Sequence, residues 1–165
     1  MKIVIGGTFS RIHFGHIKLL TKAFEMGDKV CIGLTSDSYV KKHKIVPVYP
    51  YSIRKKNLVK VINEMRPGKK YSIVMIDDKY GPSVSQDFDM IVVSPETKPT
   101  AININSIRRK NGLKPLRIVT IRRVLAYDGN PISSTRISKG EIDSSGKKVS
   151  REKSGTKTHR PLAKP

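Results

Sequence analysis

The chain has 165 residues, enough for one domain with a hydrophobic core and a short extension. No apolar run approaches the ~20 residues that cross a bilayer, and the N-terminal apolar stretch is too short for a secretion signal, so we expect a cytoplasmic protein that does not contact a membrane. The single cysteine, Cys31, excludes an internal disulfide, and the net charge of +20 favours polyanionic ligands.

Short apolar runs alternate with helical patterns along the chain. The runs predict strands at 2–6, 29–35, 71–76, 90–94 and 117–121, and helical periodicity predicts helices at 16–26, 36–42, 53–65, 100–110 and 134–139. Continuous apolar strands such as Ile91-Val92-Val93 are typical of a buried parallel sheet. The alternation therefore predicts an α/β fold, a Rossmann-like open parallel sheet with helices on both faces, which binds ligands at the carboxyl ends of its strands.

The segment GGTFSRIHFGH, Gly6 to His16, joins the first predicted strand to the first predicted helix. A helix N-terminus offers free backbone N–H groups and a positive dipole end, which suit an anion. Thr8 adds a hydroxyl, and His13 and His16 add two imidazoles. No GK[ST] sequence follows, as it would in a P-loop, and two histidines alone fall short of a zinc site. The segment predicts a polyphosphate site, with an ordinary helix cap as the alternative.

A second hydroxyl-rich helix start lies in DGNPISSTRI, residues 128–137. Ser133, Ser134 and Thr135 place three hydroxyls at a predicted helix N-terminus, and Arg136 adds a planar cation that suits phosphate. Alone, this pattern is typical of a helix cap. Together with the first motif, it predicts the other side of a phosphate clamp.

The composition changes after Asp143. Residues 144–165 are rich in Ser, Gly, Lys and Pro and contain few large apolar side chains. We therefore expect a catalytic domain at 1–143 and a basic, disordered tail at 144–165.

The motifs GTFSRIHFGH and ISSTRI resemble the HxGH and ISSTxxR motifs of the nucleotidylyltransferase superfamily. Within it, the order and spacing of TSDSYVKKHK, YSIRKKNL, DDKYGPSV and VVSPETKPTAININSIRRKNGL resemble the archaeal-type phosphopantetheine adenylyltransferases. The resemblance covers residue 1 to about residue 143. One departure is Ser138, at a position where the family usually has a basic residue; Arg136 or Lys139 would then supply the charge.

The resemblance also implies the functional residues. It implies an ATP site made by Thr8, Phe9, His13, Gly15, His16, Ser133, Ser134, Thr135 and Arg136. Lys42, or its neighbour Lys41, would bind the phosphate of the second substrate. The catalytic residues would be His16 at the α-phosphate, His13 at the leaving phosphates and Lys42 at the incoming phosphate.

The implied reaction transfers the adenylyl group of ATP to 4′-phosphopantetheine, giving dephospho-coenzyme A and pyrophosphate in coenzyme A biosynthesis. Because the attacking phosphate is already anionic, no general base and no covalent intermediate are needed. Catalysis would rest on positioning and charge stabilisation. Mg²⁺ would bridge phosphate oxygens rather than occupy a cage of protein ligands.

Two other functions stay open. The same motifs serve transfer to nicotinamide mononucleotide or flavin mononucleotide, and the residues alone do not define the acceptor. A noncatalytic nucleic-acid-binding protein would also explain the positive charge, whereas for an enzyme this charge implies only nonspecific binding to nucleic acid. The sequence does not define the oligomeric state.

Overall fold

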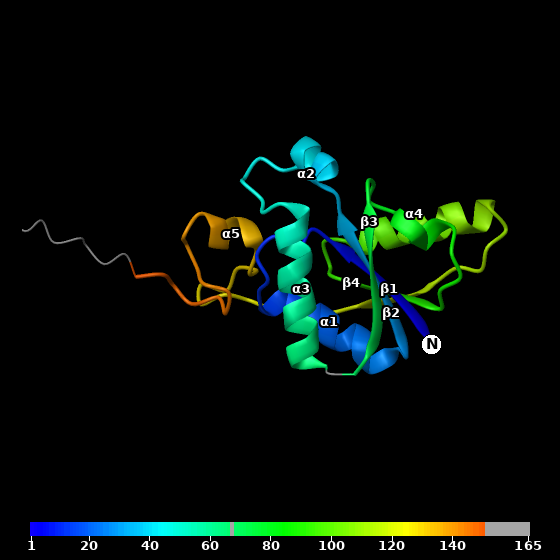
Figure 1. Cartoon of the computed structure of the whole chain (residues 1–165), viewed down its shortest axis with the longest axis horizontal. Coiled ribbons are helices and arrows are strands. Elements are labelled where there is room, and N and C mark those ends of the chain that lie inside the picture. The colour runs from blue at the N-terminus through cyan, green and yellow to red at the C-terminus, as the bar shows by residue number, and fades with distance from the viewer. Residues whose placement is uncertain (67, 151–165) are drawn as a thin grey trace, which may run out of the picture.

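A central five-stranded sheet organises the chain (Figure 1). The structure, a computed structural model, describes residues 1–66 and 68–150. All strand pairs are parallel, in the order β3-β2-β1-β4-β5. The strands are β1 (Lys2–Gly7), β2 (Lys29–Thr35), β3 (Lys70–Ile76), β4 (Met90–Val93) and β5 (Arg117–Thr120). The chain winds outward from β1 in both directions, so the switch in strand order lies between β1 and β4, where such sheets bind ligands.

Every predicted helix is present, with ends within two residues of the prediction. The helices are α1 (Phe14–Met26), α2 (Asp37–His43), α3 (Tyr51–Met65), α4 (Lys98–Lys110) and α5 (Ser134–Ser138). The sequence did not predict the short 3₁₀ helix η1 (Gly81–Val84), which follows β3. No helix in the described part of the chain is long and apolar enough to span a membrane.

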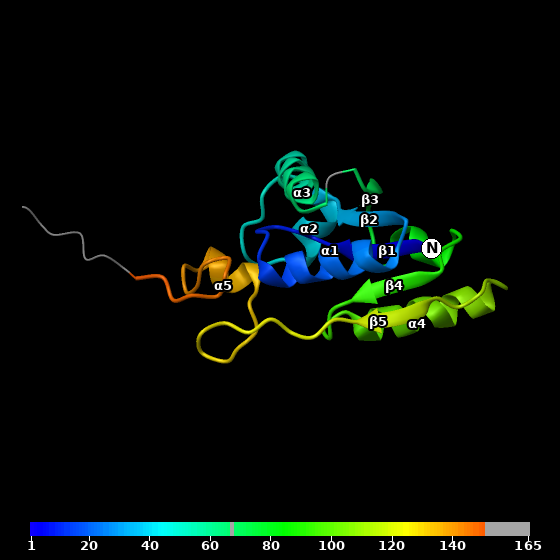
Figure 2. The ribbon, with the colours of Figure 1, turned by 90° about the horizontal axis from the view of Figure 1, so that it is seen from below.

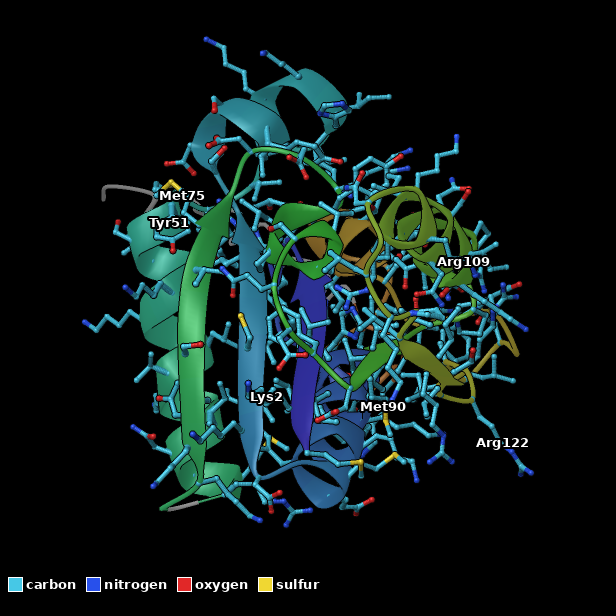
Figure 3. The ribbon with its side chains drawn as sticks, turned by 90° about the vertical axis from the view of Figure 1, so that its right-hand side faces the viewer. Lys2, Tyr51, Met75, Met90, Arg109 and Arg122 are labelled. Atoms are coloured by element: carbon cyan, nitrogen blue, oxygen red, sulfur yellow. The ribbon has the colours of Figure 1, made fainter. Side chains whose placement is uncertain are left out.

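Alternate residues of the strands face two separate hydrophobic cores, because successive side chains of a strand point to opposite faces. Ile3 and Ile5 of β1 pack in the core that α1 and α3 cover. Val4 packs in the opposite core with Ile91 of β4 and Ala101 of α4. Figure 3 shows α1 and α3 behind the sheet and α4 on its other side. This arrangement confirms the predicted parallel α/β fold with helices on both faces.

A third, smaller cluster forms where the disordered tail was expected to begin. Ile142 is buried beside Ile132, and its backbone pairs with Lys148. The Asp143 carboxylate accepts N–H bonds from Ser145 and Lys147 at 2.8 and 3.0 Å and closes the intervening turn. Residues 144–149, which the sequence assigns to the tail, form a hydrogen-bonded turn in the structure. The rest of the predicted tail, residues 151–165, lies outside the described residues.

This C-terminal turn reaches the start of the first helix. The Phe14 N–H donates to the Ser144 carbonyl at 3.0 Å, and the Tyr127 N–H donates to the Gly146 carbonyl at 2.9 Å. Figure 2 shows α5 beside the beginning of α1. The start of α1 and the C-terminal turn therefore meet at the carboxyl edge of the sheet.

Candidate active site

A cavity of about 790 Å³ opens at the carboxyl edge of the sheet. Its walls come from the turn after β1, the ends of β2 and β4, the segment 43–48 that begins at the last residue of α2, and the start of α5. This volume suits a nucleotide-sized ligand. The predicted site residues that line it are Thr8, Phe9, His13, Gly15, His16, Ser133, Ser134 and Thr135.

Phe9 shapes the floor of this cavity. Its φ of 47° lies in the left-handed region, the one such value outside glycine in the described residues. A Cβ on Gly7 would lie 2.9 Å from Cε2 of the Phe9 ring, so a side chain at position 7 would displace this ring. The buried Phe9 ring lies 4.9 Å from the His16 ring, centroid to centroid. Phe9 therefore supports His16 directly.

The two histidines stack on one another at the start of α1. Their ring centroids are 3.9 Å apart. His13 is the N-cap of α1, and its Nδ1 accepts the Gly15 N–H at 3.1 Å. A Cβ on Gly15 would lie 2.9 Å from the His13 ring, which explains the glycine of the motif. Because Nδ1 accepts a hydrogen bond, neutral His13 carries its proton on Nε2 and can donate it to a ligand.

Burial keeps both imidazoles neutral at pH 7. It lowers the pKa of His13 to about 4. Burial, reinforced by the neighbouring His13, lowers the pKa of His16 to about 3 against a smaller opposing effect of the Arg11 backbone. The buried Nδ1 of His16 has no hydrogen-bond partner among the described residues. A polar ligand that bonds to this atom would offset the energy of leaving it unpaired.

The second predicted motif is hydrogen-bonded to the first. Ser133 is the N-cap of α5 and accepts the Arg136 N–H at 3.2 Å. The Ser134 hydroxyl donates to the Arg11 carbonyl at 3.1 Å and accepts the Arg11 N–H at 3.4 Å. Residues 123 positions apart in sequence thus meet across the cavity.

Arg136, which the sequence predicts for the ATP site, is not among the residues that line the cavity. Its guanidinium pairs with Asp128 and with Glu141, at 3.0 Å from the latter, and donates to the Pro131 carbonyl at 3.2 Å. Two carboxylates and a carbonyl occupy its donors, so Arg136 stabilises the turn before α5 rather than the cavity wall.

The predicted substrate lysines are also absent from the lining. Lys41 and Lys42 lie exposed on α2, whereas His43 and Lys44, at the end of that helix, line the cavity. Arg123, which belongs to neither predicted motif, also lines the cavity and pairs with Glu96 at 2.9 Å. Its position just beyond a predicted strand, at the carboxyl edge, was the signal that could have identified it.

The described residues contain no group of three or more His, Cys, Asp or Glu side chains placed to hold a metal ion. The charged groups of the cavity are instead Lys44, Lys79, Glu96 and Arg123. Three cations and one carboxylate suit an anionic ligand, which can bring its own metal counterion.

Comparisons with known proteins show the family of this chain. Residues 4–140 match the model of the cytidylyltransferase-like family. The phosphopantetheine adenylyltransferase of Methanosarcina mazei is 50% identical over 149 residues, which are 88% of this chain and 96% of that protein. The bifunctional phosphopantetheine adenylyltransferase/NTP phosphatase of Thermoplasma acidophilum is 48% identical over 96% of this chain, and the chain spans about half of that relative's length (48%).

A solved structure has the same fold. It is described as a protein with unknown function from Archaeoglobus fulgidus and superimposes with a TM-score of 0.69 at 35% identity. The match covers 74% of this chain and 90% of that one. The chain therefore belongs to the cytidylyltransferase-like family and, within it, to the archaeal phosphopantetheine adenylyltransferases.

Proposed function

We propose that this chain transfers the adenylyl group of ATP to 4′-phosphopantetheine, producing dephospho-coenzyme A and pyrophosphate for coenzyme A biosynthesis. The observation that carries the proposal is the meeting of two phosphate-binding motifs, held together by Ser134 and Arg11, around one cavity. Relatives of 45–52% identity whose names give this activity match over most of the chain and support the choice of acceptor.

The histidines would bind the phosphates of ATP. His13 would present its Nε2–H to the β- and γ-phosphates, and the exposed Thr135 at the start of α5 would contact the same groups. His16 would contact the α-phosphate. Because an approaching polyanion favours the protonated imidazole, binding would raise the pKa values that burial lowers in the free protein.

The chemical step would be an in-line displacement. An oxygen of the acceptor phosphate attacks the α-phosphorus, the bond to the bridging α,β-oxygen breaks, and pyrophosphate leaves with the electron pair. The described residues would contribute positioning and hydrogen bonds to the transition-state charge. Mg²⁺ would enter with ATP and neutralise phosphate charge.

Lys44 is the better candidate for the acceptor phosphate. It lines the cavity, whereas Lys41 and Lys42 are exposed on α2 outside it. A lysine presents a compact positive charge that can draw a phosphate into line without a fixed bidentate geometry. Lys44→Ala should therefore raise the KM for the acceptor more than the KM for ATP.

The direct test incubates the purified chain with ATP, Mg²⁺ and one acceptor at a time: 4′-phosphopantetheine, nicotinamide mononucleotide or flavin mononucleotide. Pyrophosphate release and product mass identify the reaction. We expect dephospho-coenzyme A alone, and a turnover about 10²–10³-fold lower in His16→Ala, typical of losing one transition-state donor. Lys60→Ala, on the exposed face of α3, is the control. Product from another acceptor would refute the choice of acceptor, and no product from any would refute nucleotidylyl transfer.

A further inference from the structure

Arg54 is fully buried within α3, yet it does not line the cavity. All five of its N–H donors have acceptors. Nε donates to the Tyr49 carbonyl at 2.8 Å; one terminal nitrogen donates to the Thr8 carbonyl at 2.9 Å and to the Thr35 hydroxyl at 3.4 Å. The other donates to the Thr35 carbonyl at 2.8 Å and to the Asp37 carboxylate at 3.0 Å. A buried guanidinium is tolerated when its donors are satisfied in this way.

The acceptors of Arg54 belong to four segments that meet at the cavity. They are the turn after β1, the end of β2, the first residue of α2 and the segment that precedes α3. Thr8 and Thr35 both line the cavity, and the Thr35 hydroxyl donates to the Thr8 hydroxyl at 3.1 Å. α3 lies behind the strands in Figure 3, where Tyr51 marks its first residue. One side chain from behind the sheet therefore joins the walls of the cavity.

The bond to Thr8 acts on a strained turn. The Thr8 carbonyl belongs to the peptide group that precedes Phe9, so its orientation is coupled to the φ of Phe9. That φ is 47°, a conformation that persists only where the surroundings hold it. The ring that this conformation places lies 4.9 Å from the His16 ring. Arg54 thus connects through one peptide group and one aromatic ring to the histidine expected at the α-phosphate.

We propose that Arg54 is a positioning residue, which holds the Thr8–Phe9 peptide and through it the imidazole of His16 in the geometry that adenylyl transfer needs. The kinetic part of this inference rests on the proposed function. Its structural part, the control of His16 by Arg54, does not. Lysine cannot replace Arg54, because its three donors on one nitrogen cannot reach acceptors spread around a planar fork.

The test compares two conservative variants of buried arginines. Arg54→Lys keeps the positive charge but removes the planar guanidinium and its five donors. The control is Arg108→Lys in α4, since Arg108 is equally buried and donates to the carbonyls of Lys114, Ser83 and Gln86. Because Ser83 borders the cavity, the control is judged on kcat and on the KM for ATP.

Both variants should unfold at lower urea concentration than the parent chain. Arg54→Lys should also lose about 10²-fold in kcat, the effect of misplacing a reacting group by roughly 1 Å, with little change in the KM for ATP. Arg108→Lys should keep both constants within about twofold. An equal loss of kcat in the two variants would show that general destabilisation is the cause and would overturn the proposal.

A readout without turnover separates this inference from the proposed function. The imidazole C–H resonances of the chain are recorded by NMR, and His16→Asn assigns the one from His16. Arg54→Lys should shift the His16 resonance, and Arg108→Lys should not. If Arg54→Lys does not fold, Asp37→Asn removes the counterion of Arg54 and should shift the same resonance by a smaller amount. An unmoved His16 resonance in the folded variant overturns the inference even where the parent chain is active; a shift in an inactive parent chain would support positioning while the proposed function fails.

Discussion

Ending the chain after Asp143 instead of after Ser150 should destabilise the domain and impair the site. Residues 144–150 supply the carbonyl acceptor of the Phe14 N–H at 3.0 Å and that of the Tyr127 N–H at 2.9 Å. The same residues close the turn in which the Asp143 N–H donates to the Lys147 carbonyl at 2.9 Å. Three backbone hydrogen bonds at about 1 kcal/mol each amount to about 3 kcal/mol, a large part of the ~5–15 kcal/mol by which domains are stable.

The measurement is urea unfolding of two shortened chains, 1–143 and 1–150, which both lack the residues beyond 150. We expect the free energy of unfolding of the 1–143 chain to be lower by about 2–4 kcal/mol. Its turnover should fall as well, because Phe14 directly follows His13, the N-cap of α1. If the two chains differ by less than about 0.5 kcal/mol and turn over equally, the turn at 144–149 does not support the site.

Three further predictions concern the site. Gly15→Ala should lower kcat about tenfold or more, because its Cβ would lie 2.9 Å from the His13 ring, whereas Gly112→Ala, with nothing within 4 Å, should reduce only stability. The free energy of unfolding should fall as pH drops from 6.5 toward 5, by up to about 2.7 kcal/mol per pH unit for two groups, because the unfolded chain protonates His13 and His16 while the folded chain, with pKa values of about 4 and about 3, does not. Replacing both by Gln should flatten this dependence in urea titrations; an unchanged slope would mean that the histidines are not buried neutral. Arg136→Gln should lower the unfolding temperature and leave the Kd for ATP unchanged by calorimetry, and a weaker Kd would return Arg136 to the ATP site.

The strands and helices could be predicted because their signals are local. An apolar run such as Ile3-Val4-Ile5 and a helical apolar pattern each define an element within a few residues. The two motifs predicted to bind phosphate are also local, since their histidines and hydroxyls lie beside helix N-termini. The order of the strands then places both motifs at one edge of the sheet.

The missed features depend on contacts between distant segments. Arginine is a residue type that binds phosphate, but in this structure the Arg136 guanidinium pairs with the carboxylates of Asp128 and Glu141. The sequence does not indicate these two ion pairs. Arg54 stands in YSIRKKNL beside two lysines, and the sequence does not indicate which of the three basic side chains is buried. The sequence of residues 144–149 is as polar as that of a disordered segment. It does not indicate that two backbone carbonyls of this turn accept the N–H groups of Phe14 and Tyr127.

In the proposed reaction, one part of the cavity would bind ATP and another part would select the acceptor. The phosphate-binding motifs come from the first and last elements of the domain, whereas the opposite wall comes from residues 43–48, 79–83 and 93–101. The two parts are still joined, since Arg54 bonds both to Thr8 of the first motif and to Tyr49, next to the 43–48 wall. We therefore expect a substitution in that wall that moves the Tyr49 carbonyl to shift His16 as well, which would couple acceptor binding to the position of the ATP phosphates through Arg54.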